Sequence, residues 1–136
     1  QDRVVYFGRS LGAAVSIELA IKNPPMGMIL VAPFASLNDM AKIAFPHIPF
    51  ATWLAGNRFN SLARINQVTA PTIIIHGEQD ETVPVAQGRK LYQATNQPKQ
   101  FLALPTAGHN DTNTAGGNLY WDSLAEFLLT ISKPSR

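Results

Sequence analysis

Residues 8–12, Gly-Arg-Ser-Leu-Gly, constrain the fold of this chain most strongly because of what stands on either side of them. An apolar, strand-like run precedes them at residues 3–7, and a helical pattern of apolar residues follows from residue 11 to residue 22. A serine between two such glycines, at a turn from strand to helix, is typical of a catalytic nucleophile. The sequence therefore predicts that Ser10 presents its hydroxyl at the end of a strand.

The neighbours of Ser10 fit that interpretation. Gly8 and Gly12 are expected to be glycines because a side chain at either position would collide with neighbouring backbone. The same turn directs the backbone N–H of Leu11 toward the space in front of the serine, as one donor of an oxyanion hole. The N-terminus of the following helix adds a field that favours developing negative charge.

A glycine-rich turn from strand to helix is also found where a dinucleotide phosphate binds. That site needs the spacing G-x-G-x-x-G and an acidic residue at the end of the next strand. Residues 8–12 lack this spacing, and the next apolar run, residues 26–31, is followed by Ala-Pro-Phe. The motif therefore favours a nucleophile over a phosphate site.

Two later loops carry the residue types that complete a serine triad, in the order serine, acid, histidine. Residues 71–77, Pro-Thr-Ile-Ile-Ile-His-Gly, have the composition of a buried strand, and Asp80 follows them. Residues 100–104 predict another strand, and His109 lies in the loop beyond it. In such a triad the histidine accepts the serine proton, and the carboxylate fixes the imidazole tautomer. Ser10, Asp80 and His109 are the predicted catalytic residues, and this chemistry requires no metal or organic cofactor.

Other titratable residues have simpler interpretations. His76, at the end of a buried strand, is expected to be a hydrogen-bonded structural histidine, and His47, between prolines, a surface or packing residue. Glu78 and Glu81 flank the predicted acid and are alternatives to it, although we expect them to be solvated loop charges. Asp111 is expected to hold a loop or cap a helix.

The three motifs together resemble the C-terminal half of an α/β-hydrolase. The matching segments are residues 7–12, 76–84 and 108–111, and the similarity extends over essentially all of the sequence. Within that superfamily the chain is similar to the small-cap α/β-hydrolase-domain (ABHD) branch and its serine aminopeptidase-like relatives. The resemblance implies a serine hydrolase that cleaves a carboxylic ester or thioester, or else an amide, through an acyl-serine intermediate.

The resemblance also implies an α/β fold with a doubly wound parallel sheet and flanking helices. Four strands are predicted, which by resemblance are the fifth to eighth of the family's sheet, at residues 3–7, 26–31, 72–77 and 100–104. Helices are predicted at residues 11–22, 85–94 and 119–131. The complete sheet needs more than 136 residues, so residues 1–136 are expected to form a partial domain whose N-terminal half is absent.

That absence has two expected consequences. By resemblance, the second oxyanion donor comes from a loop that the sequence does not contain, and loss of one donor costs on the order of 100- to 1,000-fold in rate. The strand at residues 3–7 would have an open edge, through which we expect the chain to self-associate or to pair with the missing half. The alternative function is therefore a non-catalytic α/β-hydrolase-like interaction module, or an inactive fragment without the full oxyanion hole.

Residues 34–67 are the irregular part of the sequence and are predicted to be a small cap inserted after the strand at residues 26–31. Prolines limit regular helices there, so two or three short helices are expected. Phe45, Phe50 and Trp53 are expected either to form an apolar wall for an acyl chain or simply to cover the sheet.

The composition argues against a nucleic-acid partner but does not indicate the cellular compartment. The 11 basic and 9 acidic side chains give a net charge of +2, too small to indicate a nucleic-acid partner. The partner that the resemblance implies is a small acyl ester or thioester. With no cysteine there is neither a disulfide nor a thiolate metal site. The apolar stretch at residues 26–35 is too short to span a bilayer. The sequence is compatible with the cytoplasm, and a targeting segment or membrane anchor in the N-terminal part that it lacks stays open as an alternative.

Overall fold

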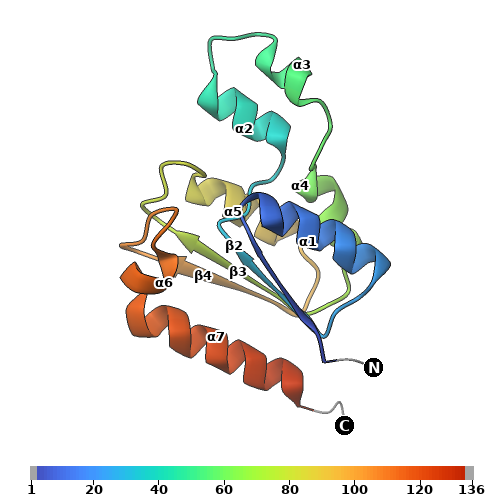
Figure 1. Cartoon of the computed structure of the whole chain (residues 1–136), viewed down its shortest axis with the longest axis vertical. Helices are drawn as coiled ribbons and strands as arrows, with labels where there is room; N and C mark the ends of the chain where they lie inside the picture. The colour runs from blue at the N-terminus through green and yellow to red at the C-terminus, as the bar shows by residue number, and fades with distance from the viewer. Residues whose placement is uncertain (1–2, 134–136) are drawn as a thin grey trace.

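The computed structural model describes residues 3–133 and shows a parallel sheet of four strands in the order β1-β2-β3-β4, with helices on both faces (Figure 1). The strands are β1 (Val5–Arg9), β2 (Gly27–Val31), β3 (Thr72–Gly77) and β4 (Lys99–Leu104). The helices are α1 (Leu11–Lys22), α2 (Leu37–Ala44), α3 (Ala51–Ala55), α4 (Ser61–Arg64), the 3₁₀ helix η1 (Ile65–Gln67), α5 (Val85–Ala94), α6 (Thr112–Ala115) and α7 (Gly117–Ser132). The predicted α/β class and parallel sheet are confirmed.

The two central strands hold the core because both of their faces are covered, as parallel sheets require. On one face Met28, Leu30 and Ile74 pack against α1 and α5. On the other face Ile29 and Ile73 pack against α7, which runs below the sheet in Figure 1. The β-branched run in β3 is therefore buried throughout, as its composition predicts.

The first strand lies two residues further along the chain than the sequence predicts. Its parallel pairing with β2 continues until Arg9 lies opposite Val31, so the strand ends immediately before Ser10. Within residues 3–133, β1 pairs with β2 on one side only, and the side chain of Phe7 is 55% exposed.

Helix α1 buries a different face from the one its large residues suggest. From the sequence, Leu11, Val15, Leu19 and Ile21 lie near one stripe of this helix and are expected to face the core, but the first three are exposed. The buried residues are Ala13, Ala14, Ile17 and Ala20. Helix α1 is apolar on more than one side, and its small alanines let the helix approach the sheet closely, so periodicity alone does not select the packed face.

Residues 34–67 form three short α-helices and η1, which confirms the expected helix count. Figure 1 shows α2 and α3 projecting from the sheet, whereas α4 lies beside α1. Lys90 on α5 contacts Asp39 on α2 at 2.6 Å, and Arg64 on α4 donates to Glu18 on α1 at 2.8 and 3.1 Å. Ion pairs as exposed as these contribute little to stability. No helix in the described part of the chain is long and apolar enough to cross a membrane.

Candidate active site

Ser10 lies in the turn between β1 and α1 with a backbone that a serine rarely adopts. Its φ is 51° and its ψ is −116°, and such a conformation costs about 1–3 kcal/mol unless the surroundings enforce it. The surroundings do so, because the Ser10 N–H donates to the Val31 carbonyl at 2.9 Å. Ser10 occupies the N-cap position of α1, yet its hydroxyl makes no capping hydrogen bond there and is left available.

The two glycines around Ser10 have different roles. A Cβ at Gly8 would lie 2.5 Å from the Gly12 carbonyl oxygen and 2.7 Å from Ala13 Cα, which confirms the predicted need for a glycine. A Cβ at Gly12 would meet nothing within 4 Å outside its own helix among the described residues. The predicted collision at Gly12 is therefore wrong for this part of the chain, because Gly12 faces open space beside α1.

Asp80 lies in the turn after β3 and is only 6% exposed. Its Oδ1 accepts hydrogen bonds from the backbone N–H groups of Thr82 at 2.9 Å and Val83 at 2.7 Å. Its Oδ2 lies 2.7 Å from Nδ1 of His109. Since an ionised carboxylate only accepts, this contact assigns the proton to Nδ1 and leaves Nε2 of His109 as the free base.

His109 belongs to the loop that follows β4, residues 105–111, which we call the histidine loop. The Gly108 N–H donates to Asp111 Oδ1 at 2.7 Å, so Asp111 holds the loop, as predicted. Asp111 also occupies the N-cap position of α6, although its side chain bonds back to the loop and not into the helix. The guanidinium of Arg9 donates to the His109 carbonyl and, at 3.0 Å, to Asn110 Oδ1.

His76 is a structural histidine, as the sequence predicts. It is fully buried, and its Nε2 lies 2.7 Å from the Val83 carbonyl, which assigns the proton to that nitrogen. Its Nδ1 has no partner among the described residues and faces Gly88, where a Cβ would lie 2.3 Å from it. Burial lowers the pKa of His76, while the Val83 carbonyl and the nearby Asp80 carboxylate oppose that shift. The lowered pKa favours the neutral form of His76, whose hydrogen bond to Val83 supports the turn that carries the acid.

The structure also distinguishes Asp80 from Glu78 and Glu81, the two alternative acids. Glu78 is exposed and pairs with Arg89 on α5 at 3.2 Å, and Glu81 is exposed. Neither glutamate contacts His109 within residues 3–133, and His47 is exposed on the segment between α2 and α3. Asp80 is thus the carboxylate that the fold brings to the histidine.

The three predicted catalytic residues follow β1, β3 and β4, and the carboxyl ends of parallel strands share one edge of the sheet. Asp80 and His109 are hydrogen-bonded, whereas no hydrogen bond joins Ser10 to His109 in the described part of the chain. Such bonds are often long until substrate binds. Leu11 is the first residue of α1, where backbone N–H groups have no acceptor within the helix.

Of the three aromatic residues predicted to form an apolar wall, one lines a groove in the structure and two do not. An open groove of about 520 Å³ lies between α2 and α3, and its lining is apolar: Leu37, Met40, Ala41, Ala44, Phe45, Ile48, Ala51, Leu54 and Ala55. Phe45 therefore lines this groove. Phe50 and Trp53 are not among its lining residues and are 70% and 77% exposed.

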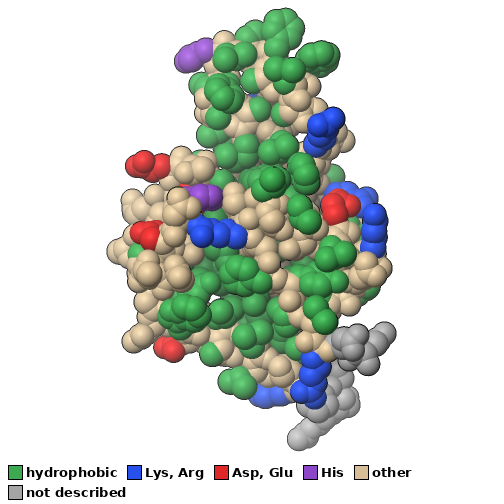
Figure 2. All heavy atoms as spheres, viewed as in Figure 1, with side chains coloured by type: hydrophobic (Ala, Val, Ile, Leu, Met, Phe, Trp, Pro, Cys, Tyr) green, Lys and Arg blue, Asp and Glu red, His purple; other side chains and the backbone are tan. Residues whose placement is uncertain are grey.

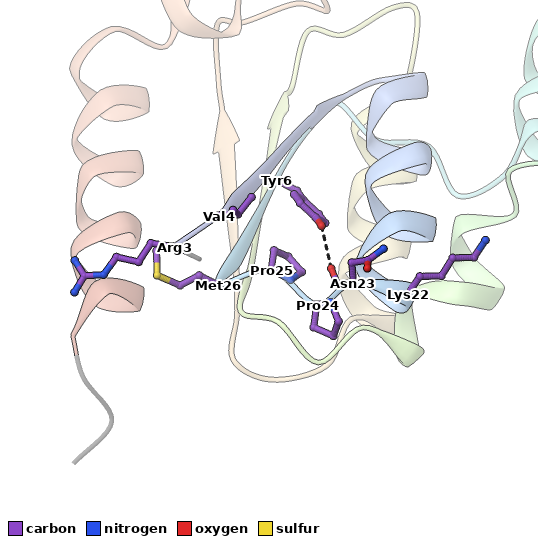
Figure 3. A pocket seen from close by; sticks show the side chains of 8 residues that line it. All are labelled: Arg3, Val4, Tyr6, Lys22, Asn23, Pro24, Pro25 and Met26. Atoms are coloured by element: carbon purple, nitrogen blue, oxygen red, sulfur yellow. Dashed lines mark hydrogen bonds between the residues drawn. The ribbon is translucent and has the colours of Figure 1, made fainter. Parts of the chain in front are cut away.

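A second pocket, of about 570 Å³, lies at the opposite end of β1 from Ser10 (Figure 3). It is lined by residues from the start of β1 and the end of α1, and Tyr6 there donates to the Asn23 carbonyl at 3.0 Å. It carries none of the predicted catalytic residues. Among residues 3–133 no group of three or more His, Cys, Asp or Glu side chains is arranged to hold a metal ion.

Comparisons with known proteins agree with the α/β-hydrolase fold. The profile of the family described as serine hydrolase (FSH1) matches residues 22–110, which include Asp80 and His109. The chain is 36% identical over 126 residues to the uncharacterized protein Rv2307c of Mycobacterium tuberculosis, covering 93% of this chain and 44% of that protein. It is 34% identical over 147 residues to the alpha/beta hydrolase domain-containing protein WAV2 of Arabidopsis thaliana, covering 93% and 47% respectively.

The chain thus spans less than half the length of these two relatives. Among solved structures, its fold is similar to that of the Pyrococcus furiosus esterase PF2001, with a TM-score of 0.74 at 19% identity. That match covers 96% of this chain and 54% of the esterase.

Proposed function

Because the chain belongs to the serine hydrolase (FSH1) family of the α/β-hydrolase superfamily, we propose that it cleaves a carboxylic ester or thioester through an acyl intermediate on Ser10. The observation that carries this proposal is the strained turn of Ser10 at the sheet edge where Asp80 and His109 form a hydrogen bond. Backbone strain of the kind seen at Ser10 is kept only where the surrounding structure enforces it, and such residues cluster at active sites.

In the proposed reaction, Ser10 Oγ forms a bond to the substrate carbonyl carbon while its proton passes to Nε2 of His109. The bond from that carbon to the leaving oxygen or sulfur then breaks, and His109 returns the proton to the leaving group. Water, activated by the same nitrogen, hydrolyses the acyl-serine. Asp80 stays ionised throughout and holds His109 in the required tautomer.

The backbone N–H of Leu11 is the proposed donor to the oxyanion that forms on the carbonyl oxygen. Its place at the start of α1 supports this role, because the helix N-terminus favours negative charge. One such donor contributes on the order of 100- to 1,000-fold in rate, so the full rate also depends on a second donor.

We propose that residues 34–67 act as a cap whose groove binds the acyl chain of the substrate. The groove is apolar throughout, and α2 follows the carboxyl end of β2, which is the sheet edge that carries Ser10. Phe45 is the aromatic residue that lines it, while Phe50 and Trp53 are proposed to extend the apolar surface beyond its rim.

A second candidate function is an interaction module without catalysis. The open edge of β1 favours it, since an apolar strand paired on one side invites another polypeptide to add to the sheet. The partner would be another copy of this chain or the N-terminal half of the fold.

Hydrolysis of p-nitrophenyl esters and an acyl-thioester by the chain, with any sequence that naturally flanks it, separates the two candidates. The catalytic proposal predicts turnover that Ser10→Ala and His109→Ala abolish without changing the folded state by circular dichroism. Unchanged turnover in Ser10→Ala would contradict it, and partner binding that survives Ser10→Ala without any turnover would favour the interaction module.

A further inference from the structure

Arg9 joins two parts of the site that lie 100 residues apart in the sequence. Its guanidinium donates from Nη2 to the backbone carbonyl of His109 and to Oδ1 of Asn110, the latter at 3.0 Å. Both acceptors are uncharged, and Arg9 forms no salt bridge among the described residues. The side chain of Arg9, the residue before Ser10, is therefore hydrogen-bonded to the backbone of His109, the proposed base.

The two ends of this connection are fixed in different ways. Arg9 is the last residue of β1, held opposite Val31 by the sheet and covalently joined to Ser10. His109 is held at Nδ1 by Asp80, a contact about which the imidazole is still able to rotate. A second hold, on the His109 carbonyl, limits movement of the backbone that carries the imidazole and so limits how far Nε2 can lie from Ser10.

The other hydrogen bonds of the histidine loop in the described part of the chain do not involve β1, the strand that precedes Ser10. The bond from Gly108 N–H to Asp111 is internal to the loop, and the Gln79 N–H donates to the Ala107 carbonyl from the turn after β3. Among the hydrogen bonds of residues 3–133, those of Arg9 are the ones that join β1 to the histidine loop.

We propose that Arg9 is a positioning residue for acyl transfer, which sets the separation of Ser10 and His109 by binding the His109 carbonyl and Asn110. This inference rests on the proposed function, since it requires Ser10 and His109 to react together. Arginine suits the role because its planar fork offers several donors in fixed directions, whereas lysine offers one flexible ammonium.

The test measures the rate constant of fluorophosphonate labelling at Ser10 together with kcat and KM on a p-nitrophenyl ester. The variants are Arg9→Met, Arg9→Lys and Asn110→Ala, in the chain with any sequence that naturally flanks it. Arg64→Met is the matched control, because Arg64 is also a partly exposed arginine with two hydrogen bonds between distant elements, α4 and α1, and it does not line the proposed acyl groove between α2 and α3.

The expected result is a fall of roughly 10- to 100-fold in kcat and labelling rate for Arg9→Met, since a displacement of about 1 Å has that order of effect. KM should stay within about twofold, because the substrate pocket is unchanged. Arg9→Lys should restore part of the rate, and Asn110→Ala should lose less than Arg9→Met. Hydrogen exchange at the amides of residues 107–112 should speed up in Arg9→Met and not in Arg64→Met.

Labelling of Arg9→Met at the wild-type rate, a loss no larger than in Arg64→Met, or unchanged exchange in the histidine loop would each overturn the inference. If Arg9→Met does not fold, Asn110→Ala decides, because wild-type kinetics and exchange in that variant would overturn it too. A wild-type chain that is not labelled, or whose labelling survives His109→Ala, would instead overturn the proposed function itself.

Discussion

At the scale of single residues, hydrogen bonds fix the orientation of two side chains at the site, Asp80 and His76. Asp80 receives two backbone N–H groups on one oxygen and His109 on the other. His76 donates to Val83 and has no partner for its second nitrogen within the described residues. The turn after β3 is therefore built around a carboxylate that accepts hydrogen bonds on both oxygens and a buried imidazole that donates one.

The pH dependence of stability follows from His76. Burial lowers its pKa below the ordinary value of 6.5, so the unfolded state binds more protons than the folded state below that pH. The contribution of His76 is fully present above about pH 6.5 and is lost as the pH falls toward the lowered pKa, at about 1.4 kcal/mol for each unit of lowering. Urea unfolding should show a loss of stability from pH 7.5 to pH 5.5 that is smaller in His76→Gln. An equal loss in the variant would contradict this assignment.

The two glycines around Ser10 offer a matched pair of substitutions. Gly8→Ala should cost about 1–3 kcal/mol or more, because the new methyl group would meet backbone that has no room to move. Gly12→Ala should be neutral or stabilise by up to about 1 kcal/mol, since alanine favours the helix and meets no neighbour outside it among residues 3–133. Urea midpoints of the two variants give the comparison, and similar losses in both would show that Gly12 is also crowded.

Much of the site is predictable from sequence at this scale, and one part is not. Ser10, Asp80 and His109 each follow a strand with a recognisable local pattern, so their shared edge of the sheet follows from the fold. The contact of Arg9 with the histidine loop has no local signal, because its two partners are distant in sequence. The requirement for glycine at position 88 is equally hidden, since it arises from the ring of His76 on another element.

At the scale of helices and strands, the elements with strong local signals lie where the sequence predicts them. The strand Thr72–Gly77 and the helices Leu11–Lys22 and Val85–Ala94 agree to the residue, because proline, glycine or asparagine marks their ends. The buried face of a helix is harder to predict from this sequence than the residues at which the helix begins and ends. The helical spacing of Leu119, Phe127, Leu128 and Ile131 predicts that they form the apolar face of α7, yet Leu119 is exposed and Tyr120 is buried. The helix begins with apolar residues on both sides, so spacing alone does not select the packed face.

The segment with α2 and α3 carries a prediction about substrate length. Ala41→Trp would fill the apolar groove, so kcat/KM should fall by roughly tenfold or more for a twelve-carbon ester, since each buried CH₂ is worth about 0.8 kcal/mol. The two-carbon ester should be unaffected. Lys42→Trp, on the exposed side of the same helix, is the control and should leave both rates unchanged. Equal loss on both esters in Ala41→Trp would argue against acyl binding in the groove.

At the scale of the whole molecule, large apolar side chains are exposed on several of the described elements, including β1, α1, α3 and α7. Figure 2 shows hydrophobic side chains over the projecting helices and over the lower part of the same face. The apolar side chains that are at least two-thirds exposed are Phe50, Trp53, Leu54 and Leu129. Exposed apolar side chains and the open edge of β1 both favour association with another polypeptide.

We therefore propose that residues 1–136 alone self-associate through the edge of β1. Phe7→Lys places a charge in that edge strand and should shift the population toward monomer, because edge lysines oppose pairing. Sedimentation velocity at several concentrations measures the distribution. A wild-type chain that sediments as a clean monomer would contradict the proposal.

The central claim is that His109 activates Ser10 for attack on a carbonyl. The most direct measurement is fluorophosphonate labelling of the chain, read by intact mass and peptide mapping, with Ser10→Ala and His109→Ala as controls. The account predicts one label, on Ser10, that is lost in Ser10→Ala and slowed by roughly 1,000-fold or more in His109→Ala, in line with the loss of a triad member. Labelling at another residue, or a rate that does not depend on His109, would contradict it.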